Sequence, residues 1–332
     1  MKIKSLFAFL LATLVWSACD NDFEVSAPWK DIPIVYGLLS SSGPVHYIRV
    51  EKAFLDPDAN ALELAQNPDS LYYDNLLVQF ERVESGELFT LERVNGTDVG
   101  LPRDPGVFAT EPNWLYKIDS AVIKLREGET IRLLIDRGNG LPVVTAETAV
   151  QGPLVLRQPL SNNFDFRENI TTKLGWSASE QATIFDAALT IHYAEFPKDD
   201  PGAVVEKSFE WRWAKGLRFE TLTPQLNIEK DGLEFFEVMA SNIPEKPNFN
   251  RLFIGIDMDL VAGGEELEKY INVTLANSGI TGAQEIPTFT NLSEGEGVFS
   301  TISQLHRTGF LITPITRDSL KSGFRTQHLN FQ

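Results

Sequence analysis

Cysteine, histidine and basic residues are all scarce in this chain. One cysteine, Cys19, occurs in 332 residues, so no disulfide can form within the chain and core packing must hold it together. The four histidines are never three or four residues apart, which excludes a zinc pair on one helix face. With 29 Lys and Arg against 46 Asp and Glu, the net charge is −17, which argues against nucleic acid as a partner.

Known catalytic and nucleotide-binding motifs are also missing. The sequence contains no G-x-S-x-G nucleophile elbow, no P-loop and no dinucleotide-binding fingerprint. We therefore expect no catalytic residues, no cofactor and no metal ion. Acidic residues are abundant, so a surface hydrolase that cleaves glycans with a pair of loop carboxylates is kept as an alternative, although no particular pair stands out.

The chain has one uninterrupted apolar run, at its start. Residues 6–16 form an eleven-residue apolar segment behind Lys2 and Lys4, which is the pattern of a secretory signal and is too short to span a membrane. Ser17, Ala18 and Cys19 then resemble a bacterial lipobox, although Trp16 stands where an aliphatic residue is usual. We predict a signal peptide over residues 1–18 and lipidation of Cys19, and the alternative is an ordinary signal peptide with a stray cysteine.

An acidic segment follows the cysteine. Residues 20–24 read Asp20, Asn21, Asp22, Phe23 and Glu24, which resembles the export tag of surface lipoproteins from Bacteroidota. The alternative is a solvated acidic linker within a tether over residues 19–30. Both interpretations place the protein on the membrane through its lipid, and we expect the outer membrane, with a surface-facing position as the more specific expectation.

Removal of the signal peptide leaves 314 residues, a length typical of two domains. Lys2 and Lys4 leave with the signal, so the mature chain carries a charge near −19 and should not bind a membrane surface through charge. The Gln151-Gly152-Pro153 segment is a plausible boundary. We therefore predict one domain over residues 31–151 and a second over residues 152–332.

Short alternating segments with turns between them predict a mostly β first domain. Their number and spacing favour an immunoglobulin-like β-sandwich. The expected strands cover residues 32–39, 46–51, 76–83, 88–94, 114–118, 130–135 and 143–150.

The second domain is predicted to be β-rich with short helices. Residues 184–193, 204–213 and 252–260 alternate as half-buried strands do. Residues 233–242 lack that alternation and favour a helix, and residues 265–269 favour a helical turn followed by a strand over residues 270–274.

Several short motifs together resemble a family of Bacteroidota lipoproteins of unknown function. They are the opening IVYGLL strand at residues 34–39, the TAET segment at residues 145–148, and TNLSEGEGVFS at residues 290–300. The resemblance implies two β-rich domains and a gene position beside TonB-dependent outer-membrane receptors, so it suggests such a receptor as a partner. The family has no established catalytic residues to transfer.

The TNLSEGEGVFS segment also has a physical interpretation. Gly295 and Gly297 permit positive φ, and Asn291 and Ser293 can hold a turn through bonds to backbone. We expect a packed turn near the end of the second domain, in preference to a ligand-binding loop.

One aromatic row is a candidate ligand-facing surface. Phe209, Trp211 and Trp213 are spaced by two, so their side chains share one face of a strand. An exposed row would bind sugar rings or an apolar partner, whereas a buried row would be the core of the second domain, which is the favoured interpretation.

These observations predict a lipid-anchored cell-envelope protein that binds a ligand or a partner and is not an enzyme. The surface hydrolase described above is one alternative. A structural adaptor of an envelope complex is the other, and it would present an exposed apolar patch large enough for a protein interface.

Overall fold

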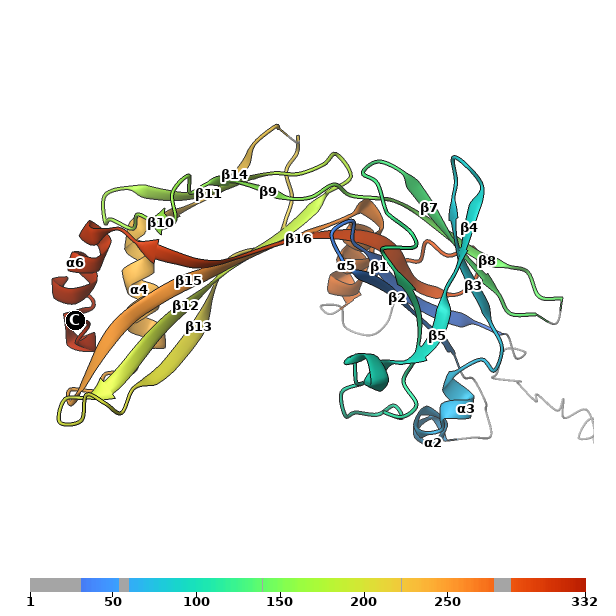
Figure 1. Ribbon diagram of the computed structural model, residues 1–332, viewed down its shortest axis with the longest axis horizontal. Helices are drawn as coiled ribbons and strands as arrows, with labels where there is room; N and C mark the ends of the chain where they lie inside the picture. Colours follow the sequence, from blue (N-terminus) through green and yellow to red (C-terminus); the bar gives the residue numbers. More distant parts are fainter. Residues whose placement is uncertain (1–30, 54–59, 139, 222, 278–287) are drawn as a thin grey trace, which may run out of the picture.

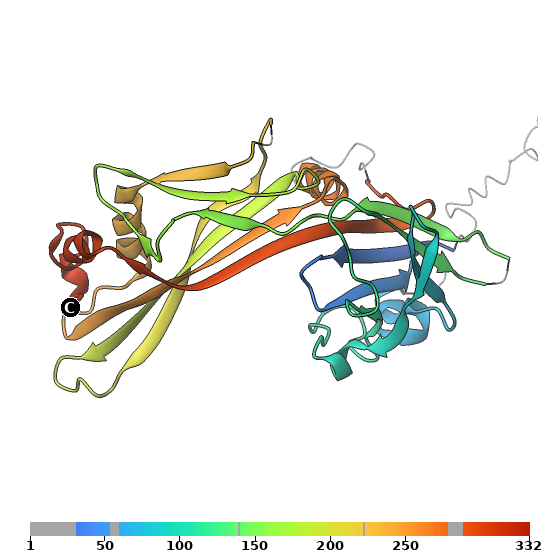
Figure 2. The ribbon, with the colours of Figure 1, turned by 45° about the horizontal axis from the view of Figure 1, so that its top comes forward.

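The molecule consists of two β-rich halves joined end to end by one long strand (Figure 1). The computed structural model describes residues 31–53, 60–138, 140–221, 223–277 and 288–332. The predicted mostly β fold class is confirmed. Figure 2 shows the same elongated arrangement from a second direction, with the joining strand running through both halves.

That joining strand is β16 (Glu296–Ile312), and it changes partners along its length. Its first part pairs in parallel with β1 (Pro33–Leu39), from Ile34 opposite Glu296 to Leu39 opposite Thr301. Its second part pairs antiparallel with β15 (Phe249–Gly263), from Gly263 opposite Ile302 to Ile256 opposite Phe310. The two halves therefore share one nine-stranded sheet, in which eight strands follow the order β13-β12-β15-β16-β1-β2-β6-β5 and the ninth, β10 (Asn163–Phe164), pairs with β16 off this path.

In the first half, this shared sheet packs on a second sheet of order β4-β3-β7-β8. The core between them combines buried side chains of both sheets, with Phe80 lying 5.8 Å from Phe299 between ring centroids. The remaining elements of this half are β2 (Val45–Lys52), α2 (Ala61–Gln66), α3 (Pro68–Leu71), β3 (Leu77–Arg82), β4 (Glu87–Thr90), β5 (Glu92–Asn95), η2 (Gly96–Val99), β6 (Trp114–Asp119), β7 (Thr130–Asp136) and β8 (Val144–Ala149).

One predicted strand of this half is divided. Residues 88–94 form two strands, β4 and β5, which belong to different sheets. The chain crosses between the sheets at Leu91, whose buried side chain joins the core while its backbone N–H bonds to the Val78 carbonyl. Alternation alone does not reveal such a crossing, because the polar and apolar order continues through it. The immunoglobulin-like strand arrangement stays a prediction.

The TNLSEGEGVFS segment closes the first half. The Asn291 side chain accepts a bond from the Phe299 N–H and donates to the Phe299 and Glu147 carbonyls, at 3.0, 2.7 and 3.1 Å. Ser293 exchanges bonds with Thr145 of β8. The expectation that these two residues hold the segment through backbone contacts is confirmed, but the segment lies in the first half. The predicted division after residue 151 stays a prediction, and residues 291–301 contact β1 and β8 of the first half.

The backbone of β1 passes so close to Gly295 and Gly297 that neither position has room for a side chain. Their φ angles are +104° and +113°, and a Cβ at either position would collide with a carbonyl oxygen of β1, that of Pro33 or that of Val35. The predicted positive φ is confirmed, and close parallel pairing with β1 adds a second reason for glycine.

In the second half, the shared sheet is covered by a sheet of order β14-β11-β9, with α4 and α6 at the far end (Figure 1). The core lies between these layers. The elements are β9 (Val155–Gln158), β10 (Asn163–Phe164), β11 (Thr171–Ser177), β12 (Ile184–Pro197), β13 (Val205–Leu217), β14 (Leu226–Asp231), α4 (Gly232–Asn242), α5 (Glu265–Asn277), α6 (Pro314–Ser322) and η3 (Gln327–Leu329).

The predicted helix over residues 233–242 is confirmed as α4. It begins with a capping box in which the Asp231 side chain and Glu234 exchange bonds with backbone N–H groups. The predicted strand over residues 270–274 is wrong, because α5 continues through these residues to Asn277. Leu267 and Ile271 are four residues apart and face one side of this helix, a spacing that also fits alternate strand positions when the window is short.

A buried charge cluster holds the C-terminal end. Glu195 is 3% exposed and contacts Lys207, Lys246 at 2.6 Å and Arg251 at 3.4 Å. The fully buried Arg251 also donates to the Leu329 carbonyl, and its backbone bonds to Asn330 and Gln332. The Glu195 carboxylate pairs with three cations, one of which is Arg251. The bonds of Arg251 to residues 329–332 attach the end of the chain to β15.

The β1–β16 pairing predicts a strong penalty at Gly297. Gly297→Ala should lower the free energy of unfolding by about 3 kcal/mol, because the methyl group meets the Val35 carbonyl in a strained backbone conformation. Gly309→Ala is the matched control: its φ is also positive, at +77°, but no atom lies within 4 Å of the added Cβ, so about 1 kcal/mol is expected. Urea denaturation followed by tryptophan fluorescence measures both, and equal losses would contradict the steric argument.

The charge cluster predicts a pH-dependent contribution to stability. Burial acts to raise the pKa of Glu195, but hydrogen bonds from Lys207 and Lys246 outweigh it and hold that pKa below its ordinary value of 4.5. A depressed pKa stabilises the fold above the unfolded value, and this contribution is lost as the pH falls through the folded value. Glu195→Gln should therefore cost about 3 kcal/mol at pH 7, and the difference from wild type should shrink below pH 4.5.

The control for this experiment is Glu210→Gln. Glu210 pairs with Arg212 on the surface, where both side chains are about half exposed, so a loss below about 0.5 kcal/mol is expected. A Glu195→Gln penalty that stays constant down to pH 3 would contradict the assigned pKa direction.

Candidate functional site

The predicted lipidation site and export tag lie outside the described residues. Cys19 and residues 20–24 belong to the segment before Asp31, the first residue that the structure describes. The structure therefore shows where the tether joins the fold, and leaves its lipidation as a prediction.

The tether joins the fold at a buried ionic contact. The Arg137 side chain is 1% exposed and contacts the Asp31 carboxylate at 3.4 Å and the Glu294 carboxylate at 2.7 Å. The Tyr73 hydroxyl also donates to Asp31, and burial followed by this hydrogen bond raises the pKa of Tyr73. Arg137 thereby connects the start of the fold, the end of β7 and the segment before β16.

The aromatic row is core, so the ligand-facing interpretation is wrong. Trp211 and Trp213 are 6% and 7% exposed, and Phe209 packs partly buried against the same cluster. Trp211 lies 5.1 Å from Trp213 and 5.5 Å from Phe166 between ring centroids. The two tryptophans pack against Phe164, Phe166 and Phe235, which removes them from solvent.

Histidines do not form a metal site in the described part of the chain. No group of three or more His, Cys, Asp or Glu side chains is placed there to hold a metal ion. His192 contacts Asp257 at 3.0 Å and His306 contacts Asp259 at 2.7 Å, as two separate pairs. His46 is buried in the first half, and burial lowers its pKa.

A largely apolar hollow lies beside α5. Figure 1 shows this helix near the place where the two halves meet. We call it the junction pocket, and its volume is about 630 Å³. Its lining residues are Ile184, Phe185, Asp186, Lys215, Gly216, Arg218, Val261, Gly263, Leu267, Ile271 and Asn272.

Glycine and a charged contact place α5 over this pocket. The absence of a side chain at Gly263 lets Leu267 approach Ile184, since a Cβ there would lie 2.9 Å from both side chains. Arg218 then bonds to Glu268 at 2.5 Å and to Asn272. The helix is therefore held above the sheet, with apolar side chains beneath it and charged side chains at the rim.

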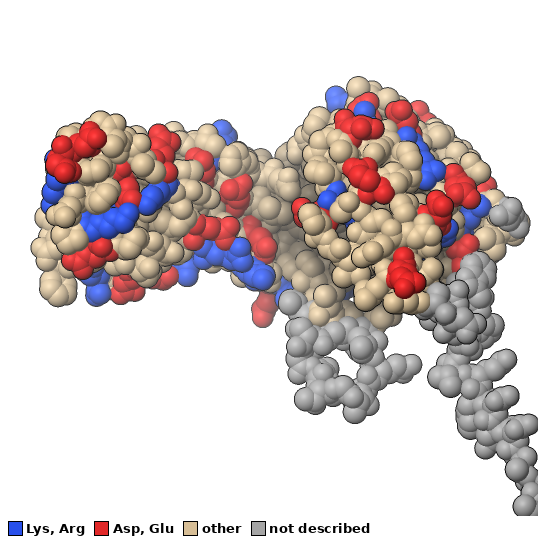
Figure 3. Space-filling model, turned by 90° about the horizontal axis from the view of Figure 1, so that it is seen from below, with Lys and Arg blue, Asp and Glu red and all other residues tan. Residues whose placement is uncertain are grey.

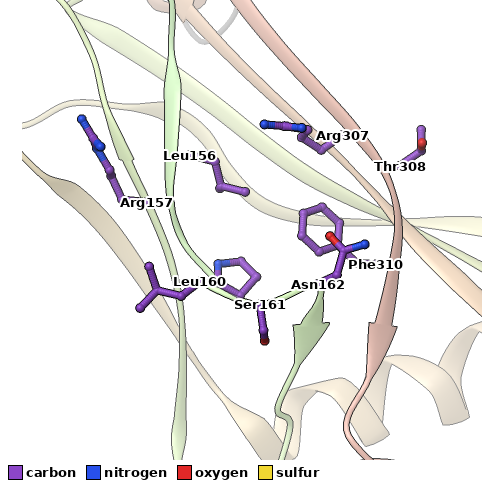
Figure 4. A pocket seen from close by; sticks show the side chains of 9 residues that line it. Leu156, Arg157, Leu160, Ser161, Asn162, Arg307, Thr308 and Phe310 are labelled. Carbon is purple, nitrogen blue, oxygen red and sulfur yellow. The ribbon is translucent and has the colours of Figure 1, made fainter.

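A second hollow, the arginine cleft, lies between β9 and β16 in the second half (Figure 4). Its volume is about 410 Å³. The lining residues are Leu156, Arg157, Pro159, Leu160, Ser161, Asn162, Arg307, Thr308 and Phe310, and none of them is acidic. Figure 4 shows Arg307 extending from β16 toward β9, with Phe310 and Leu156 forming apolar walls.

Sequence reasoning identified neither hollow. The junction pocket depends on α5, whose second half was predicted as a strand, although the four-residue spacing of Leu267 and Ile271 is a helical signal. In the arginine cleft, Leu156 and Arg307 lie about half the chain apart, and no local pattern joins them.

The outer surface mixes both charges. Figure 3 shows acidic and basic side chains interspersed on the face seen from below. No helix in the described ranges is long and apolar enough to cross a membrane.

Comparison with known proteins identifies no family. No protein-family model matches the sequence, and a search of curated proteins finds no match. Among solved structures, the chain is similar to a DUF4785 family protein from Legionella pneumophila, with 11% identity and a TM-score of 0.17. The similarity covers 66% of this chain and 48% of the Legionella protein, so this chain spans about half the length of that protein. A similarity at this TM-score supports no argument about fold or function.

Proposed function

We propose that this protein is a lipid-anchored component of the bacterial cell envelope that binds a small ligand. The junction pocket is the observation that supports ligand binding. Its volume of about 630 Å³ lies in the range of ligand sites, and apolar side chains line it beneath a few charged groups. All of its lining residues belong to the second half, from β12, β13, β15, α5 and the residues at their ends.

The anchor and the location rest on the sequence. The lipobox-like segment ending at Cys19 and the acidic segment after it support attachment to the outer membrane, with the surface-facing position as the more specific proposal. The resemblance to Bacteroidota lipoproteins supports a TonB-dependent receptor as the partner. In this proposal, the protein binds its ligand at the membrane and assists that receptor.

The direction in which carboxylate pKa values are shifted favours ligand binding over hydrolysis. A glycan hydrolase of the carboxylate-pair type uses a carboxylic acid whose pKa is raised. Hydrogen bonds lower the pKa of Glu84 and of Glu111. Burial acts to raise the pKa of Glu195, but hydrogen bonds from Lys207 and Lys246 outweigh it. In the junction pocket, Asp186 accepts a bond from the Gly216 N–H at 2.6 Å, which suits a structural role.

Lipid anchoring predicts release of a Cys19→Ser variant from membranes. The variant loses the thiol that receives the lipid, so it should move from the membrane pellet to the soluble fraction, as immunoblotting of fractionated cells will show. A variant that stays in the pellet and resists carbonate extraction would contradict the anchor.

Affinity capture of tagged wild-type protein from the detergent-solubilised envelope should repeatedly recover one outer-membrane receptor.

An apolar junction pocket predicts a distinct environment at Ile271. Because the only native cysteine is the proposed lipidation site, Ile271→Cys offers a single thiol for an environment-sensitive dye such as acrylodan. Its emission should be shifted to the blue relative to that of Val273→Cys, since Val273 lies two residues further along α5 and does not line the pocket. Small molecules extracted from the envelope should move only the Ile271 emission.

Two results would count against the pocket as a ligand site. Identical, water-like emission at both positions would show that Ile271 does not face an apolar hollow. Equal responses of both dyes to the extract would show binding to the dye or to the surface in general.

A further inference from the structure

The arginine cleft carries positive charge in a strongly acidic protein. The chain has a net charge of −17, and yet no Asp or Glu lines this hollow. Five other arginines of the second half contact a carboxylate within 4.0 Å, and they are Arg167, Arg212, Arg218, Arg251 and Arg325. Among the described residues of this half, Arg157, Arg307 and Arg317 have no such partner. Arg157 and Arg307 are exposed, and both line this hollow.

An irregularity in β16 places Phe310 on the same side of the strand as Arg307. The register changes between Met258, opposite Arg307, and Ile256, opposite Phe310, so β16 has one more residue than β15 in this interval. Gly309 has a φ of +77° there, and its N–H donates to the Asp257 carboxylate at 3.0 Å. Met258 and Ile256 are buried on one side of β15, so Arg307 and Phe310, which lie opposite them, both face that side.

The opposite walls are fixed as well. Phe310 is 3% exposed and lies 5.2 Å from Phe164 between ring centroids, so its ring has little freedom. Asn162 is held by a bond from its side-chain amide to the Gly309 carbonyl at 3.4 Å. Arg157 stands at the rim and uses its Nε to bond Ser177 at 2.7 Å, so its two terminal nitrogens face solvent.

We propose that the arginine cleft binds a small organic oxyanion. The guanidinium of Arg307 would take the anionic group in a bidentate contact, and the apolar part of the ligand would lie against Leu156 and Phe310. A hollow of about 410 Å³ is large enough for a small molecule. This site is separate from the junction pocket and takes a different class of ligand, so it goes beyond the function proposed above.

Carboxylates, phosphate esters and sulfonates share the chemistry that a guanidinium recognises. Benzoate, phenyl phosphate and benzenesulfonate present these three groups on one apolar ring, and benzamide is a neutral molecule with the shape of benzoate. Isothermal titration calorimetry with the full lipidated protein in non-ionic detergent, at constant ionic strength, tests each in turn. At least one anion should bind with saturation while benzamide does not, and the tightest anion identifies the class.

Arg307→Gln should weaken that binding by about tenfold or more, because a charge-assisted contact is lost. Arg307→Lys keeps the charge but loses the planar fork, so it should bind with intermediate affinity. Arg126→Gln is the matched control, since it removes the same charge from an exposed position in the first half. Far-UV circular dichroism of each variant checks that it is folded.

Three results would overturn the proposal. One is the absence of saturable binding for every anion. The second is equal weakening by Arg307→Gln and Arg126→Gln, which would indicate a general charge effect. The third is unchanged binding in Arg307→Gln with new self-association, which would show that Arg307 only protects the free edge of β16.

Discussion

The backbone pairing of β16 with two different partners is the interaction on which the rest of the structure depends. Its first part completes the sheet of the first half beside β1, and its second part completes the sheet of the second half beside β15. A strand of 17 residues is about 55 Å long, so it extends through the whole molecule. Pairing with β1 ends at Thr301 and pairing with β15 begins at Ile302, so β16 itself is the strand that spans the change of partner.

Both candidate sites derive their geometry from this strand. Ser300 of β16 accepts a bond from the Leu267 N–H, and Glu266 accepts bonds from Ser300 and from Thr148, so the first turn of α5 is fixed between the halves. Further along β16, the bulge before Phe310 places that ring on the same side of the strand as Arg307, and both residues line the arginine cleft. One strand therefore places an apolar pocket beside its middle and a cationic cleft near its end.

Buried ion pairs fix both ends of the described fold. Arg137 holds Asp31 at the entry from the tether, and Arg251 holds the C-terminal residues together with Glu195. With no disulfide available, these contacts act together with apolar packing, since Leu329 and Phe331 are buried in the core of the second half.

Several features of this protein follow from local sequence, and others needed the tertiary structure. Alternation predicted most strands, and its absence predicted the helix over residues 233–242. The presence of glycine at positions 295 and 297 predicted positive φ there. Local patterns also identified the lipobox-like segment at Cys19. They did not predict that residues 291–301 return to the first half, that the chain changes sheets at Leu91, or that Arg307 meets Leu156 across a cleft. Those features arise from contacts between residues far apart in the chain, and the two candidate binding sites exist only because of them.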